Sequence, residues 1–375
     1  MIETIFWFSM ITLIYSFLGY PVILKCAALC RKSRPYGKKG FTPSVSIVLS
    51  VYNEEYIISE KIKNILSLDY PKELLETVII SDACTDRTDE IIKSFKCDKI
   101  KFLVQEKRGG KTTAINRGVS VANGDIILFT DANSMFDRDA IKELVKHFAV
   151  SNIGLVSGRS IYLDSNNSEE EVGGVYRKYE EMLKRDESRL YSIVGADGAI
   201  YAMRRNLFEP LRPEFINDFV HTIQVVHKGY RAITEPEAKC REVIDETHKD
   251  ELQRQTRIMA QSWLVYFSNI GKLVRKGKLL YAWEFTSHKF LRWLTLPVMF
   301  LCFVSTVMLL REGAFFLIIF GFQLVFLSLM ICGGKLKGGI IRFPYFFFII
   351  NFAALLGLYK LTRGKVYLTW NPGND

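Results

Sequence analysis

An apolar run that ends in oxygen-bearing side chains sets the fold class of this chain. Residues 125–133, Asp-Ile-Ile-Leu-Phe-Thr-Asp-Ala-Asn, follow directly on Gly124. Such a run is typical of a strand covered on both faces in a parallel-type sheet. Ligands bind outside the carboxyl ends of such strands, so Asp131 and Asn133 are predicted to line a ligand crevice. Their oxygens suit a hard divalent cation that bridges phosphates, whereas an Asx turn closing the strand is the alternative.

Alternating strand and helix patterns place this run in a larger sheet. Upstream, the periodicity predicts strands at Val45–Val51, Thr77–Ile80 and Lys101–Val104, and helices at Glu54–Leu68, Asp86–Phe95 and Lys111–Ala122. This order is typical of a parallel, doubly wound α/β sheet. Downstream, it predicts a helix at Asp139–Phe148, a strand at Gly154–Arg159 and a charged helix at Ser168–Leu190. Residues 41–250 are therefore expected to form one α/β domain.

An uncharged segment precedes that domain. Ile5–Leu24 contains twenty residues without a charge, enough to cross a bilayer as a helix. The absence of Lys or Arg before Lys25 argues against a cleaved signal peptide. Basic residues follow directly, namely Arg31, Lys32, Arg34, Lys38 and Lys39. Because positive charge favours the cytoplasmic side, residues 1–30 are predicted to be a transmembrane anchor and the α/β domain to be cytoplasmic.

The C-terminal part of the chain is predicted to be membrane-associated. Residues 251–293 carry broad apolar faces, which predicts interfacial amphipathic helices, with helices packed on the sheet as the alternative. About three spans are predicted within residues 294–360, at Leu294–Leu310, Ala314–Cys332 and Phe343–Leu358. Lys360 and Arg363 run against the positive-inside trend, so the side of the tail, residues 361–375, is left open. A multi-pass protein of the cell membrane is expected.

The net charge and the cysteine content of the chain indicate which classes of binding partner to expect. The net charge is +10, but no basic stretch is interleaved with stacking aromatics in a recognisable nucleic-acid module. No nucleic-acid partner is therefore predicted, and anionic lipid is the better match for the positive charge. The seven cysteines are odd in number and lack metal-ligand spacing, which favours reduced thiols over a disulfide scaffold.

Several short motifs, in one order along residues 43 to 270, resemble family 2 glycosyltransferases with a GT-A fold. They are Val45–Glu55, Ile80–Thr88, Gly109–Lys111, Thr130–Asn133, Gly195–Ala199, Asn217-Asp218 and Arg254-x-x-Arg257. The segment Ser287–Leu294 looks like the membrane-embedded branch related to cellulose, chitin and hyaluronan synthases. The resemblance implies a doubly wound GT-A domain that binds a nucleotide sugar, together with transmembrane and interfacial helices.

The resemblance assigns donor-binding roles to residues at the strand ends. Tyr52, Asn53 and Glu54 would enclose the base and ribose of a nucleoside diphosphate, although Glu54 could simply favour a helix N-terminus. Asp82 would hydrogen-bond a uracil edge, with a turn Asp as the alternative. Lys111 stands just before a predicted helix, where diphosphate oxygens are readily bound.

The family's Asp-x-Asp motif corresponds to Asp131 and Asn133, which would hold Mg²⁺ or Mn²⁺. The second position is Asn here, so this pair brings less negative charge than the family's pair. Asp218 would be the general base that deprotonates the acceptor hydroxyl in a single, inverting displacement, with helix capping as its alternative role. Asp197, between two glycines, is a candidate acceptor- or donor-facing residue, and a structural turn Asp is the alternative.

Arg254 and Arg257 resemble the family's Gln-x-x-Arg-Trp box, which binds the acceptor end and the diphosphate. The Gln position is Arg254 and the Trp position is Ile258. Loss of the Trp removes a stacking surface for an acceptor sugar, which puts processive polymerisation in doubt. Arg257 keeps the planar fork that suits a diphosphate.

The sequence thus predicts an inverting, metal-dependent glycosyltransferase. It would transfer sugar from a nucleotide sugar, with UDP as the expected nucleotide, to a glycan or lipid-linked acceptor in surface or exopolysaccharide synthesis. The first alternative is a single-sugar transferase acting on a polyprenyl phosphate or a lipid glycan. The second is a non-catalytic nucleotide-sugar-binding subunit of a polysaccharide secretion complex. Oligomer formation and export partners are further candidates.

Overall fold

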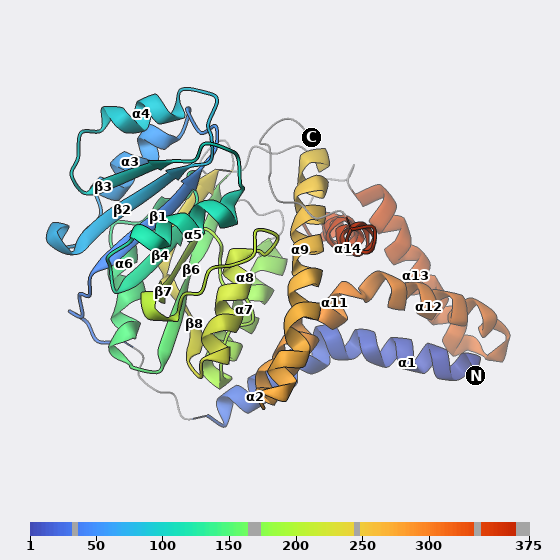
Figure 1. Cartoon of the computed structure of the whole chain (residues 1–375). Coiled ribbons are helices and arrows are strands. Elements are labelled where there is room, and N and C mark those ends of the chain that lie inside the picture. The colour runs from blue at the N-terminus through green and yellow to red at the C-terminus, as the bar shows by residue number, and fades with distance from the viewer. Residues whose placement is uncertain (32–36, 164–173, 244–247, 334–338, 365–375) are drawn as a thin grey trace.

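The computed structural model describes residues 1–31, 37–163, 174–243, 248–333 and 339–364. Within them, one mixed sheet lies at one end of the molecule and a group of apolar helices projects from the other (Figure 1). The sheet order is β3-β2-β1-β4-β7-β6-β8-β5.

The first half of the sheet is parallel, as predicted. Its strands are β1 (Val45–Val51), β2 (Leu75–Ser81), β3 (Ile100–Val104) and β4 (Ile126–Thr130). The second half adds β5 (Met135–Phe136), β6 (Ile153–Leu163), β7 (Ile200–Arg204) and β8 (Arg231–Val243). β7 runs antiparallel to both β4 and β6, so the sheet is mixed. The predicted strand Gly154–Arg159 lies within β6, whereas β7 and β8 were not predicted.

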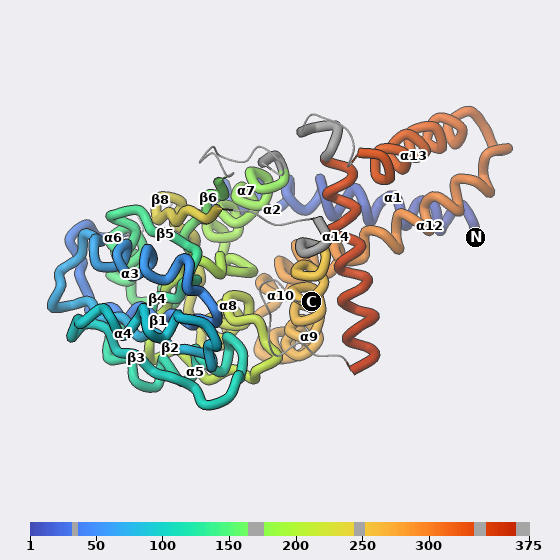
Figure 2. The backbone as a smooth tube through the Cα atoms, turned by 90° about the horizontal axis from the view of Figure 1, so that it is seen from above, coloured from blue at the N-terminus to red at the C-terminus, as the bar shows by residue number. Residues whose placement is uncertain are grey.

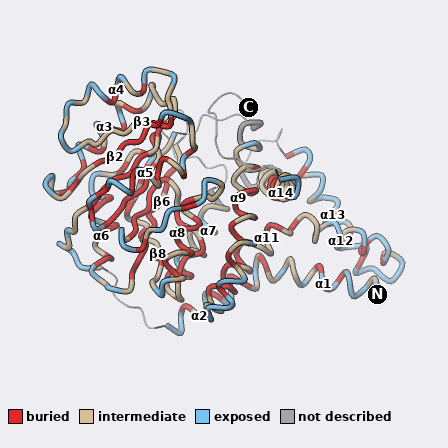
Figure 3. Tube along the Cα trace, in the orientation of Figure 1, coloured by how far each residue is buried: buried red, intermediate tan, exposed pale blue. Residues whose placement is uncertain are grey.

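Helices cover both faces of the sheet because successive apolar side chains of a strand point to opposite faces, and each face must be shielded from water. Their bounds are α3 (Ile58–Leu66), α4 (Thr88–Ser94), α5 (Lys111–Val121), α6 (Ala140–Val145), α7 (Gly174–Leu190) and α8 (Asn217–His227). Ile47 and Leu128 share a buried cluster with α6, while Val48 and Phe129 share one with α5. Figure 3 shows the resulting buried strands at the centre of the domain. Neighbouring residues of one strand thus belong to opposite layers.

A buried ion pair ties the second half of the sheet to the helical layer and predicts an acid-sensitive stability. Glu235 of β8 lies 2.6 Å from His147 Nε2 and 2.8 Å from Lys146 Nζ. Burial opposes its charge, but these hydrogen bonds hold the pKa of Glu235 at about 2. Because the folded-state pKa is below the unfolded one, this stabilisation is present above about pH 4.5 and is lost toward about pH 2.

Glu235→Gln is therefore expected to lower the unfolding free energy at pH 7 by about 1–3 kcal/mol and to flatten its fall between pH 5 and pH 2.5. Thermal unfolding of the full chain in detergent across this range measures both effects. The control is Glu237→Gln, because the Glu237 side chain is 67% exposed in its pair with Lys239. Parallel pH profiles for Glu235→Gln and wild type would contradict the assignment.

Within the part of the chain that the structure describes, three helices are long and apolar enough to cross a membrane, namely Ile2–Leu29, Ala314–Cys332 and Phe343–Thr362. The first joins α1 (Ile2–Ile14), a π-helical turn (Tyr15–Gly19) and α2 (Tyr20–Leu29), and the second is α13. A bent pair, Leu279–Trp293 with Thr295–Met308, could form a fourth span broken by 60°. This pair ends in α12 (Thr295–Met308), which packs with α1 and α13 around Phe6. These apolar helices indicate membrane association.

Two further helices lie crosswise to this group. They are α9 (His248–Arg275) and α14 (Gly339–Thr362). Figure 1 looks along the axis of α14, and Figure 2 shows it running across the direction of α12 and α13. The indole of Trp263 donates to the carbonyl of Ala354 at 3.0 Å. A Cβ on Gly357 would lie 2.7 Å from the backbone nitrogen of Ala260, so glycine permits this close crossing of α14 over α9.

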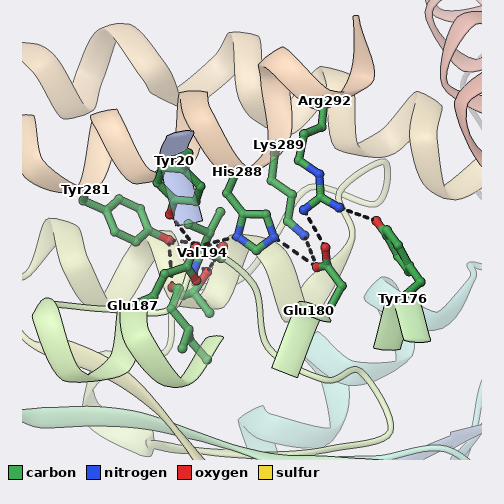
Figure 4. A network of polar contacts seen from close by, with 11 residues as sticks. Tyr20, Tyr176, Glu180, Glu187, Val194, Tyr281, His288, Lys289 and Arg292 are labelled. Carbon is green, nitrogen blue, oxygen red and sulfur yellow. Dashed lines mark hydrogen bonds and ion pairs between the residues drawn. The ribbon is translucent and has the colours of Figure 1, made fainter. Parts of the chain in front are cut away.

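A buried polar network joins the sheet domain to the apolar helices (Figure 4). It connects α7 to α10 (Leu279–Phe285), the π-helical turn Thr286–Phe290 and α11 (Leu291–Trp293). His288 lies 2.5 Å from Glu187 and 3.0 Å from Glu180, and Arg292 lies 2.5 Å from Glu180. Tyr20 of α2 donates to Glu187 at 2.9 Å. The network therefore fixes how the domain sits on the apolar helices.

Candidate active site

The loops after β1 and β2 are bonded to each other at the carboxyl end of the sheet. Asn53 adopts a positive φ of 53°, which Asn tolerates better than most residues. Its amide oxygen accepts from the backbone of Thr85 at 2.9 Å, and its Nδ2 donates to Thr85 Oγ1 at 3.1 Å. The backbone of Glu54 donates to Thr88 Oγ1 at 2.8 Å. These hydrogen bonds hold Asn53 and Glu54 in fixed positions relative to the loop after β2.

Asp82 organises the loop that precedes α5. Its buried carboxylate accepts from the backbone of Gly109 at 2.7 Å and of Gly110 at 2.8 Å, and from Gln105 Nε2 at 3.1 Å. Arg108, which directly precedes Gly109, stacks its guanidinium over the ring of Tyr52, with Cζ 3.7 Å from the ring centre. Asp82 thus holds the glycine loop in place; its predicted contact with a uracil edge stays a prediction.

Asp82→Asn should test this role. An amide cannot accept at both positions, so we expect the donor KM to rise about tenfold from the loss of a charge-assisted hydrogen bond. Calorimetric titration should show UDP and GDP weakened by a similar factor, with the exposed Asp98→Asn as control. A loss confined to UDP would instead assign the carboxylate to the base, and unchanged binding would contradict both roles.

Lys111 lies between the two carboxylates predicted to carry the chemistry. It begins α5 and its ammonium forms an ion pair with Asp131. Burial alone would lower the pKa of Lys111, but the carboxylates of Asp131 and Asp218 raise it, with Arg257 opposing them. Asp82 holds the two residues before Lys111. The three predicted carboxylates therefore meet around the N-terminus of α5.

The surroundings of Asp131 suit a divalent cation. The Asp131 side chain is 37% exposed, and exposed Asn133 lines a hollow of about 450 Å³ with Asn53 and Glu54. Burial raises the pKa of Glu54 to about 7, and the charge of Asp131 adds to this shift. The carboxylates of Glu54 and Asp131 thus lie close enough to disfavour each other's charge. No group of three His, Cys, Asp or Glu residues that could hold a metal occurs among the described residues, so phosphate oxygens would have to complete a Mg²⁺ or Mn²⁺ shell.

Asp218 is the second residue of α8, whose start is fixed by α5. Thr112 Oγ1 donates to Asn217 Oδ1 and to the carbonyl of Phe215, both at 2.9 Å. Burial raises the pKa of Asp218 above its usual value; Lys111 opposes this shift and Asp197 adds to it. A carboxylate with a raised pKa is a stronger base. The raised pKa of Asp218 is in keeping with the predicted general base.

Asp197 bonds mainly to the chain around it. Its carboxylate accepts from the backbone of Ser160 at 2.9 Å and from Ser160 Oγ at 2.7 Å, and its backbone donates to Ser157 Oγ at 2.8 Å. These contacts fix the approach to β7. They match the structural alternative for Asp197, while its role toward a sugar stays a prediction.

The two predicted box arginines lie on α9. Arg257 lies near enough to Lys111 to oppose the rise in its pKa. Arg254 acts on Tyr162 at the end of β6. The structure thus brings Arg257 to the predicted centre and Arg254 to its flank.

Sequence reasoning missed two charged residues. Burial raises the pKa of Glu242 to about 7, with Asp131 and Asp197 adding to the shift, so Glu242 stands within reach of both. Lys61 is fully buried beneath the loop that follows β4, where Nζ donates to Thr130 Oγ1 at 2.9 Å and to the carbonyl of Ser134. Lys61 resembles an ordinary surface charge on an amphipathic helix. Glu242 could have been found only by predicting β8.

The sequence matches a known protein family over the first part of the α/β domain. Residues 46–212 match the family model described as Glycosyl transferase family 2. The chain carries a family 2 glycosyltransferase domain. The resemblance predicted from the motifs is thereby confirmed.

Curated relatives share part of this domain. The probable glycosyltransferase YdaM of Bacillus subtilis (strain 168) is 27% identical over 232 residues, 57% of this chain and 54% of its own length. Poly-beta-1,6-N-acetyl-D-glucosamine synthase of Staphylococcus epidermidis is 24% identical over 268 residues, 69% of this chain and 65% of its own length. Beta-monoglucosyldiacylglycerol synthase of Nostoc sp. (strain PCC 7120) is 33% identical over 151 residues, 38% of this chain and 32% of its own length. The matched part of the chain thus spans from about a third to just under two thirds of the length of these relatives.

A solved structure supports the fold. A mannosyltransferase from Pyrobaculum calidifontis, in complex with GDP-Man and Mn²⁺, matches with a TM-score of 0.72 and 20% identity. The match covers 97% of this chain and 100% of that one. The predicted GT-A architecture with added apolar helices is therefore confirmed.

Proposed function

We propose that this family 2 glycosyltransferase domain moves a sugar from a nucleotide sugar to a hydroxyl acceptor at a membrane, with inversion. The observation that carries the proposal is the convergence of Asp82, Asp131 and Asp218 around the N-terminus of α5. A non-catalytic binding subunit would not need a carboxylate of raised pKa beside this centre.

Each residue has a defined task in this reaction. Lys111 and Arg257 would bind the diphosphate, and Asp131 with Asn133 would hold Mg²⁺ or Mn²⁺. When bound, the metal would supply charge that stabilises the leaving diphosphate. Asp218 would take the proton of the acceptor hydroxyl as its oxygen attacks the anomeric carbon. The Mn²⁺ in the similar mannosyltransferase supports the metal assignment.

The acceptor is proposed to be a glycan or a lipid-linked sugar. The polysaccharide synthase among the relatives favours the first. The diacylglycerol-glycan synthase and the missing Trp after Arg257 favour a single addition to a lipid.

A panel of UDP-sugars and GDP-mannose tests the reaction, using the full chain in lipid nanodiscs with Mn²⁺, Mg²⁺ or EDTA. We expect one UDP-sugar to release UDP, and EDTA to abolish the release. Activity with GDP-mannose alone would overturn the uridine assignment, and full activity in EDTA would overturn the metal. Absence of turnover with every donor, while UDP still binds, would favour the binding subunit.

We propose that the catalytic domain is cytoplasmic and that α14 lies in the inner interface. α1 with α2, α12 and α13 would cross the bilayer, and the crosswise α14 would keep Lys360 and Arg363 on the inner side. This arrangement removes the conflict with the positive-inside trend, and it replaces the third predicted C-terminal span.

Cysteine labelling in intact cells tests this topology, after replacement of the seven native cysteines. Glu312→Cys, in the turn between α12 and α13, should react with a membrane-impermeant maleimide. Thr362→Cys, at the end of α14, should react only after permeabilisation. Labelling of Thr362→Cys in intact cells would show that α14 crosses the membrane.

A further inference from the structure

A second hollow, of about 150 Å³, lies between α7 and the strands β6 and β8. Its lining includes four basic side chains, Arg159, Arg177, Lys184 and Arg185. Arg177 is held over the ring of Tyr162 at 4.3 Å. This basic pocket is distinct from the larger hollow beside Glu54 and Asn133, where the donor is expected.

The acidic side chains around the basic pocket already have partners. Glu181 pairs with Arg159 at 2.8 Å, Glu180 pairs with Arg292 at 2.5 Å, and Asp197 accepts from Ser160. Among the described residues, Arg177, Lys184 and Arg185 have no carboxylate within ion-pair distance. The pocket therefore has a surplus of positive charge, which favours an anion.

The basic pocket reaches both the catalytic base and the membrane helices. Asp197 and Lys184 line it, and both act electrostatically on Asp218. A Cβ on Gly198 would lie 3.4 Å from Asp218 Oδ2. On the other side, Glu180 bonds to Lys289 and Arg292, just before α12 leaves the domain (Figure 4). An acceptor held in the bilayer would pass this point to reach Asp218.

We propose that the basic pocket binds the phosphate of a membrane-lipid headgroup whose free hydroxyl is the acceptor. This inference rests on the proposed function. Arg177 presents a planar fork suited to phosphate, and Lys184 adds a second charge-assisted donor. The hydroxyl oxygen forms the new bond to the anomeric carbon as the bond to the diphosphate breaks. The proton passes to Asp218, and the nucleoside diphosphate leaves with the bonding electrons.

Short-chain lipids test the pocket without requiring turnover. Dihexanoyl-phosphatidylglycerol, dihexanoylglycerol and glycerol 3-phosphate are titrated into the full-length protein in neutral detergent with saturating UDP. We expect the phosphatidylglycerol to bind at least about tenfold tighter than either of the other two. Arg177→Gln and Lys184→Gln should each remove most of this preference. The control is Lys178→Gln, an exposed residue of α7 outside the pocket, which should leave it within about twofold.

Each outcome decides one claim. Unchanged lipid binding in both charge variants, with normal melting temperatures, would overturn the pocket while leaving donor turnover as a separate result. Equal affinity for glycerol 3-phosphate would overturn a lipid source and assign the site to free phosphate. Loss of lipid preference in Lys184→Gln supports the pocket even if every nucleotide sugar in the panel fails. With an active donor, the same variant should raise the KM for lipid more than it lowers kcat.

Discussion

Replacing Asp218 with Asn is expected to lower the transfer rate by about 10²- to 10⁴-fold, the usual contribution of general-base catalysis. The amide cannot accept the proton of the acceptor hydroxyl. Its size and its place at the start of α8 are nevertheless preserved, because the helix start is fixed by Thr112 and Asn217 rather than by Asp218. UDP affinity should therefore stay within about twofold of wild type.

Nucleotide release and direct UDP binding, measured on the same preparation, separate these effects. Asp69→Asn is the control, because the side chain of Asp69 is 53% exposed and pairs with Lys142; it should leave turnover unchanged. An Asp218→Asn enzyme that keeps more than a tenth of its turnover would exclude Asp218 as the base.

Glu180→Gln is expected to destabilise the protein by about 3–5 kcal/mol, the usual effect of removing one partner from a buried ion pair. Burial would raise the pKa of Glu180, yet Arg292 and its neighbours hold it well below the usual value. Its carboxylate faces His288 and Arg292, whose side chains are 1% and 7% exposed. The uncharged amide would leave these groups without their counter-charge.

Thermal unfolding in detergent measures this loss, with Glu90→Gln as the matched helical control. Glu90 also pairs with an arginine, but both side chains are 77% exposed, so the expected change is at most about 1 kcal/mol. If Glu180→Gln melted like the control, the polar network would not stabilise the junction.

The first half of the fold could be predicted because its local patterns agree with its long-range pairing. β1, β2 and β4 are rich in apolar residues and almost fully buried, and β1 pairs in parallel with both β2 and β4. β7 is only five residues long and ends in Arg204, β8 mixes polar and charged residues and Pro236 with its apolar ones, and both strands pair with β6. No local period identifies such partners, so the mixed half of the sheet was missed.

The site shows the same division. Motif spacing identified Asp82, Asp131 and Asp218, but not that Asp82 is hydrogen-bonded by the backbone of Gly109 and Gly110. The orientation of α14 was also beyond the sequence, because hydropathy reports length and composition but not direction. Only its packing against Trp263 and Ala260 reveals that orientation.

The reversed direction of β7 has a mechanical consequence. Ile200, at the start of β7, pairs with Thr130, at the end of β4. The loop that leads into β7 and the loop that follows β4 are therefore held together by backbone hydrogen bonds between the two strands. The distance between the loop after β4 and the loop before β7 is thus set by strand register, where a slip of one residue means a shift of about 3.3 Å. Paired strands fluctuate less than a loop does. Any adaptation to acceptors of different size would therefore have to come from the helices around the sheet.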